Sequence, residues 1–192
     1  YNEAHRLFYA IDDVEKFSKN KIIKNVEYIF VDDGSTDNSV EILKNFFNKK
    51  KKIKCKLIKI KKNIGKGNAI KRGIALAKKE WILTLDTDIS VSLLQLNDWI
   101  KKKYIKKSFL IYFGSRLLKN SKISFKIHRK ILGFVFYFLL KSMFQLNIKD
   151  TQCGFKLYKN KTAKILFKKI KDNGYVHDVE IALLSKKYNF PI

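Results

Sequence analysis

Residues 81–88 read Trp-Ile-Leu-Thr-Leu-Asp-Thr-Asp, a short apolar run that ends in two carboxylates, Asp86 and Asp88. Apolar runs of this length between polar residues are typical of buried strands in a parallel sheet. In an extended chain, residues two apart point to the same side, so both carboxylates can converge on one ligand. Ligands of open α/β sheets collect outside the carboxyl ends of the strands. The stretch therefore predicts a strand that delivers two acids to a site suited to a divalent cation and a substrate phosphate.

The rest of the chain alternates strands and helices around this run. Helical spacing of apolar residues or short apolar runs predict helices over 3–20, 38–48, 67–79, 92–103, 122–146, 160–170 and 178–188, and strands over 27–31, 54–60, 109–113 and 154–158. This order predicts an α/β fold with a mostly parallel sheet flanked by helices. With 192 residues and a single proline, the chain is expected to form one domain.

The formal charge of +25 does not by itself indicate a nucleic-acid partner. Only four of the 42 basic residues are arginines, Arg6, Arg72, Arg116 and Arg129. Arginine is the residue suited to forked phosphate recognition, so these positions are more informative than the lysine total. No RNA-binding or helix-turn-helix pattern accompanies the charge, so we expect no nucleic acid.

The remaining composition suggests a reduced, intracellular protein. The two cysteines lie far apart and in no metal-ligand spacing. No stretch reaches the roughly 18–20 apolar residues of a membrane-spanning helix. The nearest, Ile131–Leu140, has the length of a buried helix or of one that lies in the bilayer interface, and both interpretations stay open.

Two other loops are expected beside Asp86 and Asp88. Residues 32–37, Asp-Asp-Gly-Ser-Thr-Asp, follow a strand and offer carboxylates to a base or ribose hydroxyl, although the same residues also form a capped turn without any ligand. Residues 63–68, Asn-Ile-Gly-Lys-Gly-Asn, precede a helix and can bring backbone amides and Lys66 to a phosphate.

Four segments occur in a characteristic order, namely Tyr1-Asn2-Glu3-Ala4, Val31–Asp37, Asn63–Ala69 and Asp86–Asp88. Together they resemble the inverting glycosyltransferases of family 2. Further on, Gly114-Ser115-Arg116, Arg129 and Asp150-Thr151-Gln152-Cys153-Gly154-Phe155-Lys156-Leu157 resemble the polyprenyl-phosphate branch, and most closely its dolichyl-phosphate glucosyltransferases, with the mannosyltransferases slightly further off. His177-Asp178-Val179-Glu180 is similar to a Phe-Asp-Val-Glu segment of that branch, with histidine in place of the aromatic residue.

The resemblance implies the GT-A fold of nucleotide-diphospho-sugar transferases, with a nucleotide-sugar half over residues 1–108 and an acceptor half over 109–192. Family members begin with a strand that ends in Pro-x-Tyr-Asn-Glu, so the sequence is expected to start just after that strand and to be truncated at both ends.

The resemblance also implies a role for each candidate residue. On the donor side, Tyr1, Glu3 and Asp33 would line the nucleoside pocket and Lys66 would approach the nucleotide phosphates. Asp86 and Asp88 would hold Mg²⁺ or Mn²⁺ on UDP-glucose or GDP-mannose.

On the acceptor side, Arg116 and Arg129 would face the phosphate of a polyprenyl lipid, at the cytoplasmic face of a membrane with which the protein associates peripherally. An anionic phosphate acceptor requires no strong base. A hydroxyl acceptor would require one, and Asp150 or Asp178 would be the candidates.

Two other functions remain as alternatives. Leu85–Ser90 also resembles the Asp-x-Asp motif of haloacid-dehalogenase-like phosphatases, in which Asp86 would be the nucleophile, although that motif normally lies on the first strand. The other alternative is a non-catalytic basic module, which would bind nucleic acid in a salt-sensitive manner.

Overall fold

The computed structural model describes the backbone of residues 1–117 and 127–192 and the side chains of residues 1–117 and 133–192. The helices are α1 (Leu7–Ser18), α2 (Ser39–Lys49), α3 (Lys66–Leu76), α4 (Gln95–Lys101), α5 (Ile127–Phe144), α6 (Asn160–Lys169) and α7 (His177–Lys187). The strands are β1 (Tyr28–Asp32), β2 (Cys55–Lys59), β3 (Trp81–Thr84), β4 (Ile111–Phe113) and β5 (Lys156–Lys159). Every element expected from the sequence has a counterpart, and residues 122–126 of the expected long helix lie outside the described residues.

The strands form one parallel pair and one antiparallel sheet. β1 and β2 run parallel, with Tyr28 opposite Cys55. Within the described residues β2 pairs with β1 alone. β5 lies between β3 and β4 and is antiparallel to both. The parallel pairing and full burial expected for residues 81–85 are therefore wrong, because β3 is antiparallel to β5 and its residues are half-buried.

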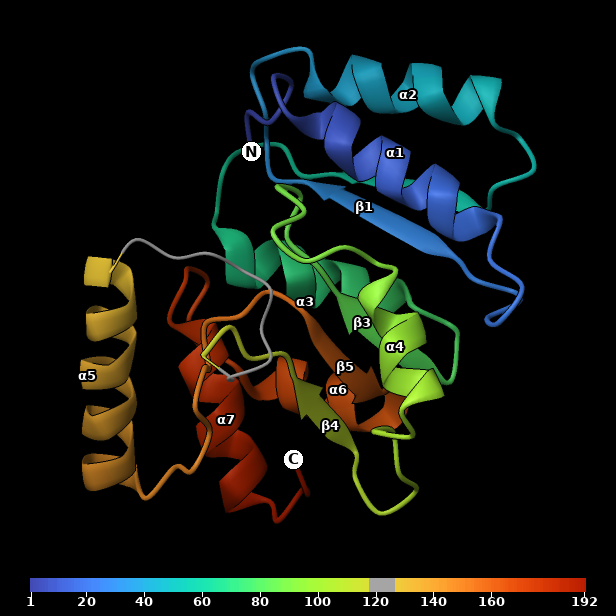
Figure 1. The fold of residues 1–192 in the computed structure, drawn as a ribbon. Helices are drawn as coiled ribbons and strands as arrows, with labels where there is room; N and C mark the ends of the chain where they lie inside the picture. Colours follow the sequence, from blue (N-terminus) through green and yellow to red (C-terminus); the bar gives the residue numbers. More distant parts are fainter. Residues whose placement is uncertain (118–126) are drawn as a thin grey trace.

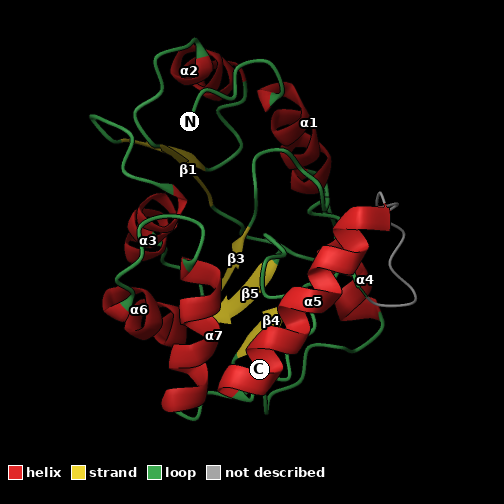
Figure 2. Ribbon diagram, turned by 90° about the vertical axis from the view of Figure 1, so that its left-hand side faces the viewer, coloured by secondary structure: helices red, strands yellow, loops and turns green. Residues whose placement is uncertain are grey.

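Helices cover the strands on two sides. Figure 2 shows α3, α6 and α7 on one side of the strands and α1 and α4 on the other. The first side buries a cluster formed by Ile74, Ile111, Tyr158, Ala163, Leu166, Phe167, Ile170 and Ile181. The second side buries Val14, Phe17, Phe46 and Leu93 against half-buried residues such as Leu83 and Leu85. β3 thus lies between two apolar layers, and the segment that follows it emerges at the end of the strand.

Helix α5 lies at the margin of the molecule beside α7 (Figure 1). Its contact with α7 is a buried apolar cluster of Leu140, Leu146, Val179 and Ala182. Among its described side chains, from residue 133 on, seven large apolar ones are exposed, namely Phe134, Val135, Phe136, Phe138, Leu139, Met143 and Phe144. Of residues 133–140, only Leu140 is buried, so the interpretation of this stretch as a core helix does not hold for its described part. None of the described helices is long and apolar enough to cross a membrane.

Candidate active site

The loop after β1 and the turn before α3 are joined through Asp33. The carboxylate of Asp33 is buried and accepts hydrogen bonds from the backbone N–H groups of Ile64 (3.1 Å) and Gly65 (2.7 Å). Gly34 allows this close approach, because a Cβ atom there would lie 2.5 Å from the carbonyl carbon of Lys62 and the residue has a positive φ of 77°. The two loops therefore gather as expected, and Asp33 contributes by fixing the turn that carries Lys66.

The first residues of the chain lie against the same loop. The backbone N–H of Asn2 donates to Ser35 Oγ (2.9 Å) and that of Ala4 to Asp37 Oδ2 (3.0 Å). Glu3 forms a two-point ion pair with Arg6, and the Arg6 hydrogen bond lowers the pKa of Glu3 despite the opposing effect of burial. Tyr1 is half-exposed beside this segment. The structure thus places Tyr1, Glu3 and Asp33 around one loop.

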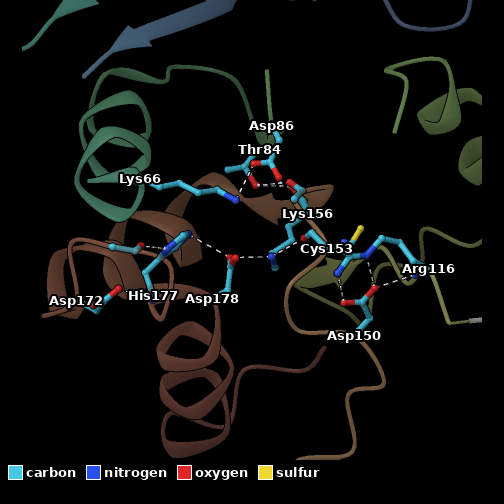
Figure 3. A network of polar contacts seen from close by, with 12 residues as sticks. Lys66, Thr84, Asp86, Arg116, Asp150, Cys153, Lys156, Asp172, His177 and Asp178 are labelled. Carbon is cyan, nitrogen blue, oxygen red and sulfur yellow. Dashed lines mark hydrogen bonds and ion pairs between the residues drawn. The ribbon is translucent and has the colours of Figure 1, made fainter. Parts of the chain in front are cut away.

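Lys66, at the start of α3, reaches the acidic end of β3. Its Nζ lies 2.8 Å from Asp86 Oδ1 (Figure 3). Burial alone would lower the pKa of Lys66, but the charge and hydrogen bond of Asp86 outweigh it and raise that pKa. Asp86 also lies directly against Gly154, where a Cβ atom would come within 2.2 Å of Asp86 Oδ2. The motif around Gly154 therefore meets Asp86 through a close contact that only glycine permits.

The backbone amides near Lys66 are occupied by the protein itself. Gly65 N–H donates to Asp33, Gly67 N–H to the carbonyl of Gly174 (3.1 Å), and Asn68 N–H to the carbonyl of Asn173 (3.2 Å). The amide cradle for a phosphate that residues 63–68 suggested is therefore wrong for these three groups. The Lys66 side chain remains as the group of this turn that faces Asp86.

Asp86 and Asp88 have the chemistry of a substrate-bridging cation site. Asp86 is partly exposed, and the more exposed Asp88 accepts a hydrogen bond from the Ser90 N–H (3.0 Å) through Oδ1. Among the described residues no group of three His, Cys, Asp or Glu side chains that could hold a metal is present. Mg²⁺ is commonly held by one or two carboxylates with substrate phosphates and water, and Mn²⁺ also favours oxygen ligands. The donor set therefore fits Mg²⁺ or Mn²⁺ shared with a phosphate.

Arg116 and Asp150 form a second ion pair near Cys153 (Figure 3). Arg116 Nε lies 2.8 Å from Asp150 Oδ2 and its Nη2 lies 3.0 Å from Oδ1, and the backbone N–H of Arg116 also donates to Oδ2 (2.9 Å). The hydrogen bond with Asp150 raises the pKa of Arg116. This two-point contact fixes the plane of the guanidinium. The side chain of Arg129 lies outside the described residues.

Asp178 is held in a buried cluster with Lys156 and His177. Lys156 Nζ donates to Asp178 Oδ1 (2.7 Å) and to the carbonyl of Cys153, and His177 Nε2 lies 3.2 Å from Asp178 Oδ1. All three side chains are almost fully buried. Burial alone would raise the pKa of Asp178, but the neighbouring His177 and Lys156 lower it. Lys156 was not predicted as the partner of Asp178, although a lysine within the apolar run Phe155–Tyr158 indicates a buried ion pair.

Comparison with known proteins defines the class of the fold. The chain superposes with a TM-score of 0.61 on glucosyl-3-phosphoglycerate synthase from Mycobacterium tuberculosis in complex with Mn²⁺ and uridine-diphosphate-glucose, at 17% identity over 98% of this chain and 61% of that chain. The fold is the GT-A fold of nucleotide-diphospho-sugar transferases, as the resemblance implied.

The family follows from the sequence match. The model of glycosyl transferase family 2 matches residues 1–167, and the chain belongs to this family. It is 35% identical to the dolichyl-phosphate beta-glucosyltransferase of Dictyostelium discoideum and 31% identical to that of Homo sapiens, in each case over 100% of this chain and 62% of the relative. The chain thus spans about three fifths of the length of these relatives. The phosphatase interpretation of Leu85–Ser90 is wrong, because the family is one of sugar transferases.

Proposed function

We propose that this chain transfers a hexose from a nucleotide sugar to a polyprenyl phosphate with inversion at the anomeric carbon, and that the donor is UDP-glucose and the acceptor dolichyl phosphate. The acceptor follows the names of the relatives that are 31–35% identical, and the donor follows the UDP-glucose bound to the M. tuberculosis synthase. The observation that carries the proposal is that Asp150 and Asp178, the two carboxylates that could act as a base, both form ion pairs with basic side chains.

A hydroxyl acceptor needs a carboxylate that can remove its proton. Asp150 is bound at two points by Arg116, and Asp178 is buried against Lys156 with a lowered pKa. The neighbouring positive charge keeps Asp178 in its ionised form and makes it a weaker base, and both carboxylate oxygens of Asp150 are occupied by the guanidinium of Arg116. A phosphate acceptor is already anionic and needs no proton removed. The two ion pairs therefore support a phosphate acceptor over a hydroxyl acceptor.

On the donor side, residues 1–108 would bind the nucleotide sugar. Tyr1, Glu3 and Asp33 would line the nucleoside pocket, and Lys66 would place its positive charge against the diphosphate. Asp86 and Asp88 would hold Mg²⁺ or Mn²⁺. When bound, the cation would supply charge stabilisation for the departing nucleoside diphosphate.

On the acceptor side, residues 109–192 would bind the lipid. Arg116 would face the lipid phosphate with a guanidinium whose orientation Asp150 fixes, and Arg129 would add a second positive charge. A phosphate oxygen would then attack the anomeric carbon on the side opposite the leaving group, which inverts its configuration. The two halves would meet at the contact of Asp86 with Gly154.

We place this reaction at the cytoplasmic face of a membrane, where the protein would associate peripherally through α5. Seven large apolar side chains are exposed on the part of this helix whose side chains the structure describes, and Lys141 lies among them. Apolar residues with basic neighbours are typical of helices that lie in the bilayer interface. The positive charge of the whole chain favours an anionic lipid surface.

The test uses the complete protein with membranes, Mg²⁺ or Mn²⁺, and labelled UDP-glucose or GDP-mannose in parallel. Label that enters a polyprenyl-phosphate lipid from UDP-glucose, and is lost in Asp88→Ala, is the expected result. Transfer from GDP-mannose alone would replace the donor. Label that enters a glycan or protein hydroxyl would overturn the acceptor, and absence of transfer from either donor would overturn the proposal.

A further inference from the structure

The segment that carries both acids is held in a strained conformation. After β3 the chain turns so that the Ile89 N–H donates to the carbonyl of Asp86 (3.1 Å). Ile89, directly after Asp88, has a positive φ of 50°. This left-handed region is unfavourable for a β-branched residue. Such a conformation persists only when the surrounding structure holds it in place.

Helices α1 and α2 hold the side chain of Ile89. It packs on the cluster formed by Leu7 and Ala10 of α1 and Leu43 of α2. These three residues are almost fully buried, so the cluster offers a fixed surface. The residue with the unfavourable backbone conformation is therefore also the residue whose side chain anchors the turn to the helices.

A buried carboxylate of α1 holds the same segment a few residues later. Asp13 is 6% exposed, and it accepts hydrogen bonds from Ser92 Oγ (2.5 Å) and from the backbone N–H of Leu93 (2.6 Å). Leu93 is itself buried against Val14 and Phe17 of α1. A buried charge is costly unless it is hydrogen-bonded, so Asp13 is stable only while this segment stays in place.

We infer that Asp13 and Ile89 are positioning residues for the cation site, and that they act by fixing Asp88 between β3 and helix α1. The inference rests on the proposed function, because it assumes that Asp86 and Asp88 hold the cation. Neither Asp13 nor Ile89 is expected to touch it. Asp88 lies between the two anchors and β3, so a loss of either anchor releases the turn that carries it.

The expected loss of Mn²⁺ affinity follows from the general behaviour of residues that orient metal ligands. Loss of such an outer partner typically weakens metal binding by about 10–100-fold.

α1 also begins just after Glu3 and Arg6, and the charge of Asp88 contributes to the raised pKa of Arg6, after the larger effects of Glu3 and of burial. The same helix therefore links the cation site to the residues proposed for the nucleoside.

The test measures Mn²⁺ binding directly, by the loss of the electron paramagnetic resonance signal of free Mn²⁺, on the complete protein with UDP. It is done well below the temperature of unfolding of each variant. Asp13→Asn removes the charge that both donors bind, and Ile89→Gly accepts the positive φ but removes the anchor. Both variants are expected to bind Mn²⁺ at least about tenfold more weakly than the unmodified protein.

Two control variants separate positioning from general destabilisation. Asp12→Asn changes the neighbouring residue of α1, which forms an ion pair with Lys16 on the same helix, and should leave Mn²⁺ binding unchanged. Leu166→Ala opens a cavity in the cluster on the other side of the strands and should lower the unfolding temperature without changing Mn²⁺ affinity.

The inference is overturned when folded Asp13→Asn and Ile89→Gly bind Mn²⁺ as the unmodified protein does, or when Leu166→Ala weakens binding equally. A different result identifies failure of the proposed function. If the unmodified protein binds no Mn²⁺, or if Asp88→Ala binds it equally well, the cation site itself is wrong and the inference falls with it.

Discussion

Replacement of Gly154 by alanine should lower the rate of transfer by about 100-fold while leaving the protein folded. The new Cβ atom would lie 2.2 Å from Asp86 Oδ2 and 2.4 Å from Asp86 Cγ. Carbon and oxygen atoms that do not bond stay more than about 3 Å apart, so the carboxylate must move by about 1 Å. A displacement of this size at a reacting centre can cost about 100-fold in rate, which corresponds to about 2.7 kcal/mol in the activation free energy.

The effect on stability should be small by comparison. Gly154 has no positive φ, so alanine accepts its backbone and gains about 0.4–1 kcal/mol by restricting the unfolded chain. The loss of the partly exposed Lys66–Asp86 pair costs at most about 1 kcal/mol. These effects nearly cancel, so the unfolding temperature should change by no more than about 4 °C.

The assay compares Gly154→Ala with Gly133→Ala, in which the new Cβ atom would make ordinary contacts of 3.5 and 3.6 Å with Leu117. Initial rates of hexose transfer, Mn²⁺ binding and unfolding temperature are measured for both variants. Gly133→Ala should retain the rate of the unmodified protein. A folded Gly154→Ala variant that keeps its rate and its Mn²⁺ affinity within about threefold would refute the contact between residues 86 and 154 as a functional one.

Four further predictions concern other parts of the molecule. Lys156→Met leaves the buried charge of Asp178 without its ion-pair partner and should lower the free energy of unfolding, measured in urea, by about 3–5 kcal/mol. Adding Asp178→Asn should restore much of that free energy. Because folding lowers the pKa of Asp178, this carboxylate stabilises the fold at neutral pH and loses its effect as the pH falls through its folded pKa. The difference in free energy of unfolding between the unmodified protein and Asp178→Asn should therefore shrink in acid. A constant difference from pH 7 to pH 3 would contradict this. Arg116→Lys loses the two-point contact with Asp150 and should raise the KM for the lipid phosphate by about tenfold in steady-state kinetics, without a similar change in the KM for the nucleotide sugar. Phe138→Asp combined with Met143→Asp should weaken flotation with anionic vesicles by at least about tenfold, and undiminished flotation would remove α5 from the membrane contact.

Local patterns predicted most of the elements because each depends on near neighbours in the chain. The run from Trp81 to Asp86 was apolar and ended in an acid, and β3 and its exposed end follow from that. The two glycines of residues 65 and 67 predicted a turn before a helix, and Lys66 begins α3 there. In both cases the residue types of one short segment are enough to determine its local structure.

Other features depend on residues far apart in the chain. An apolar run predicts burial but carries no information about the direction of its partner strand, so the antiparallel pairing of β3 with β5 was missed. The role of Asp13 could not be predicted either, because its hydrogen-bond donors are Ser92 and Leu93, about 80 residues later. The backbone amides of the turn at residues 65–67 were likewise predicted to face a phosphate. Their actual partners, Asp33 for Gly65 and Gly174 for Gly67, lie far away in the chain and leave no local pattern.

The central place of β5 constrains how the chain folds as it leaves the ribosome. β3 and β4 are made early, but the strand that pairs with both spans Lys156–Lys159. Until that strand has emerged, neither of the earlier strands has its partner, while β1 and β2 can already pair. Long-range pairing of this kind is intrinsically slow and leaves strand edges exposed to other chains. The growing chain therefore passes through a stage in which the acidic end of β3 is complete in sequence but has no sheet to support it, and protection by chaperones would matter most during that interval.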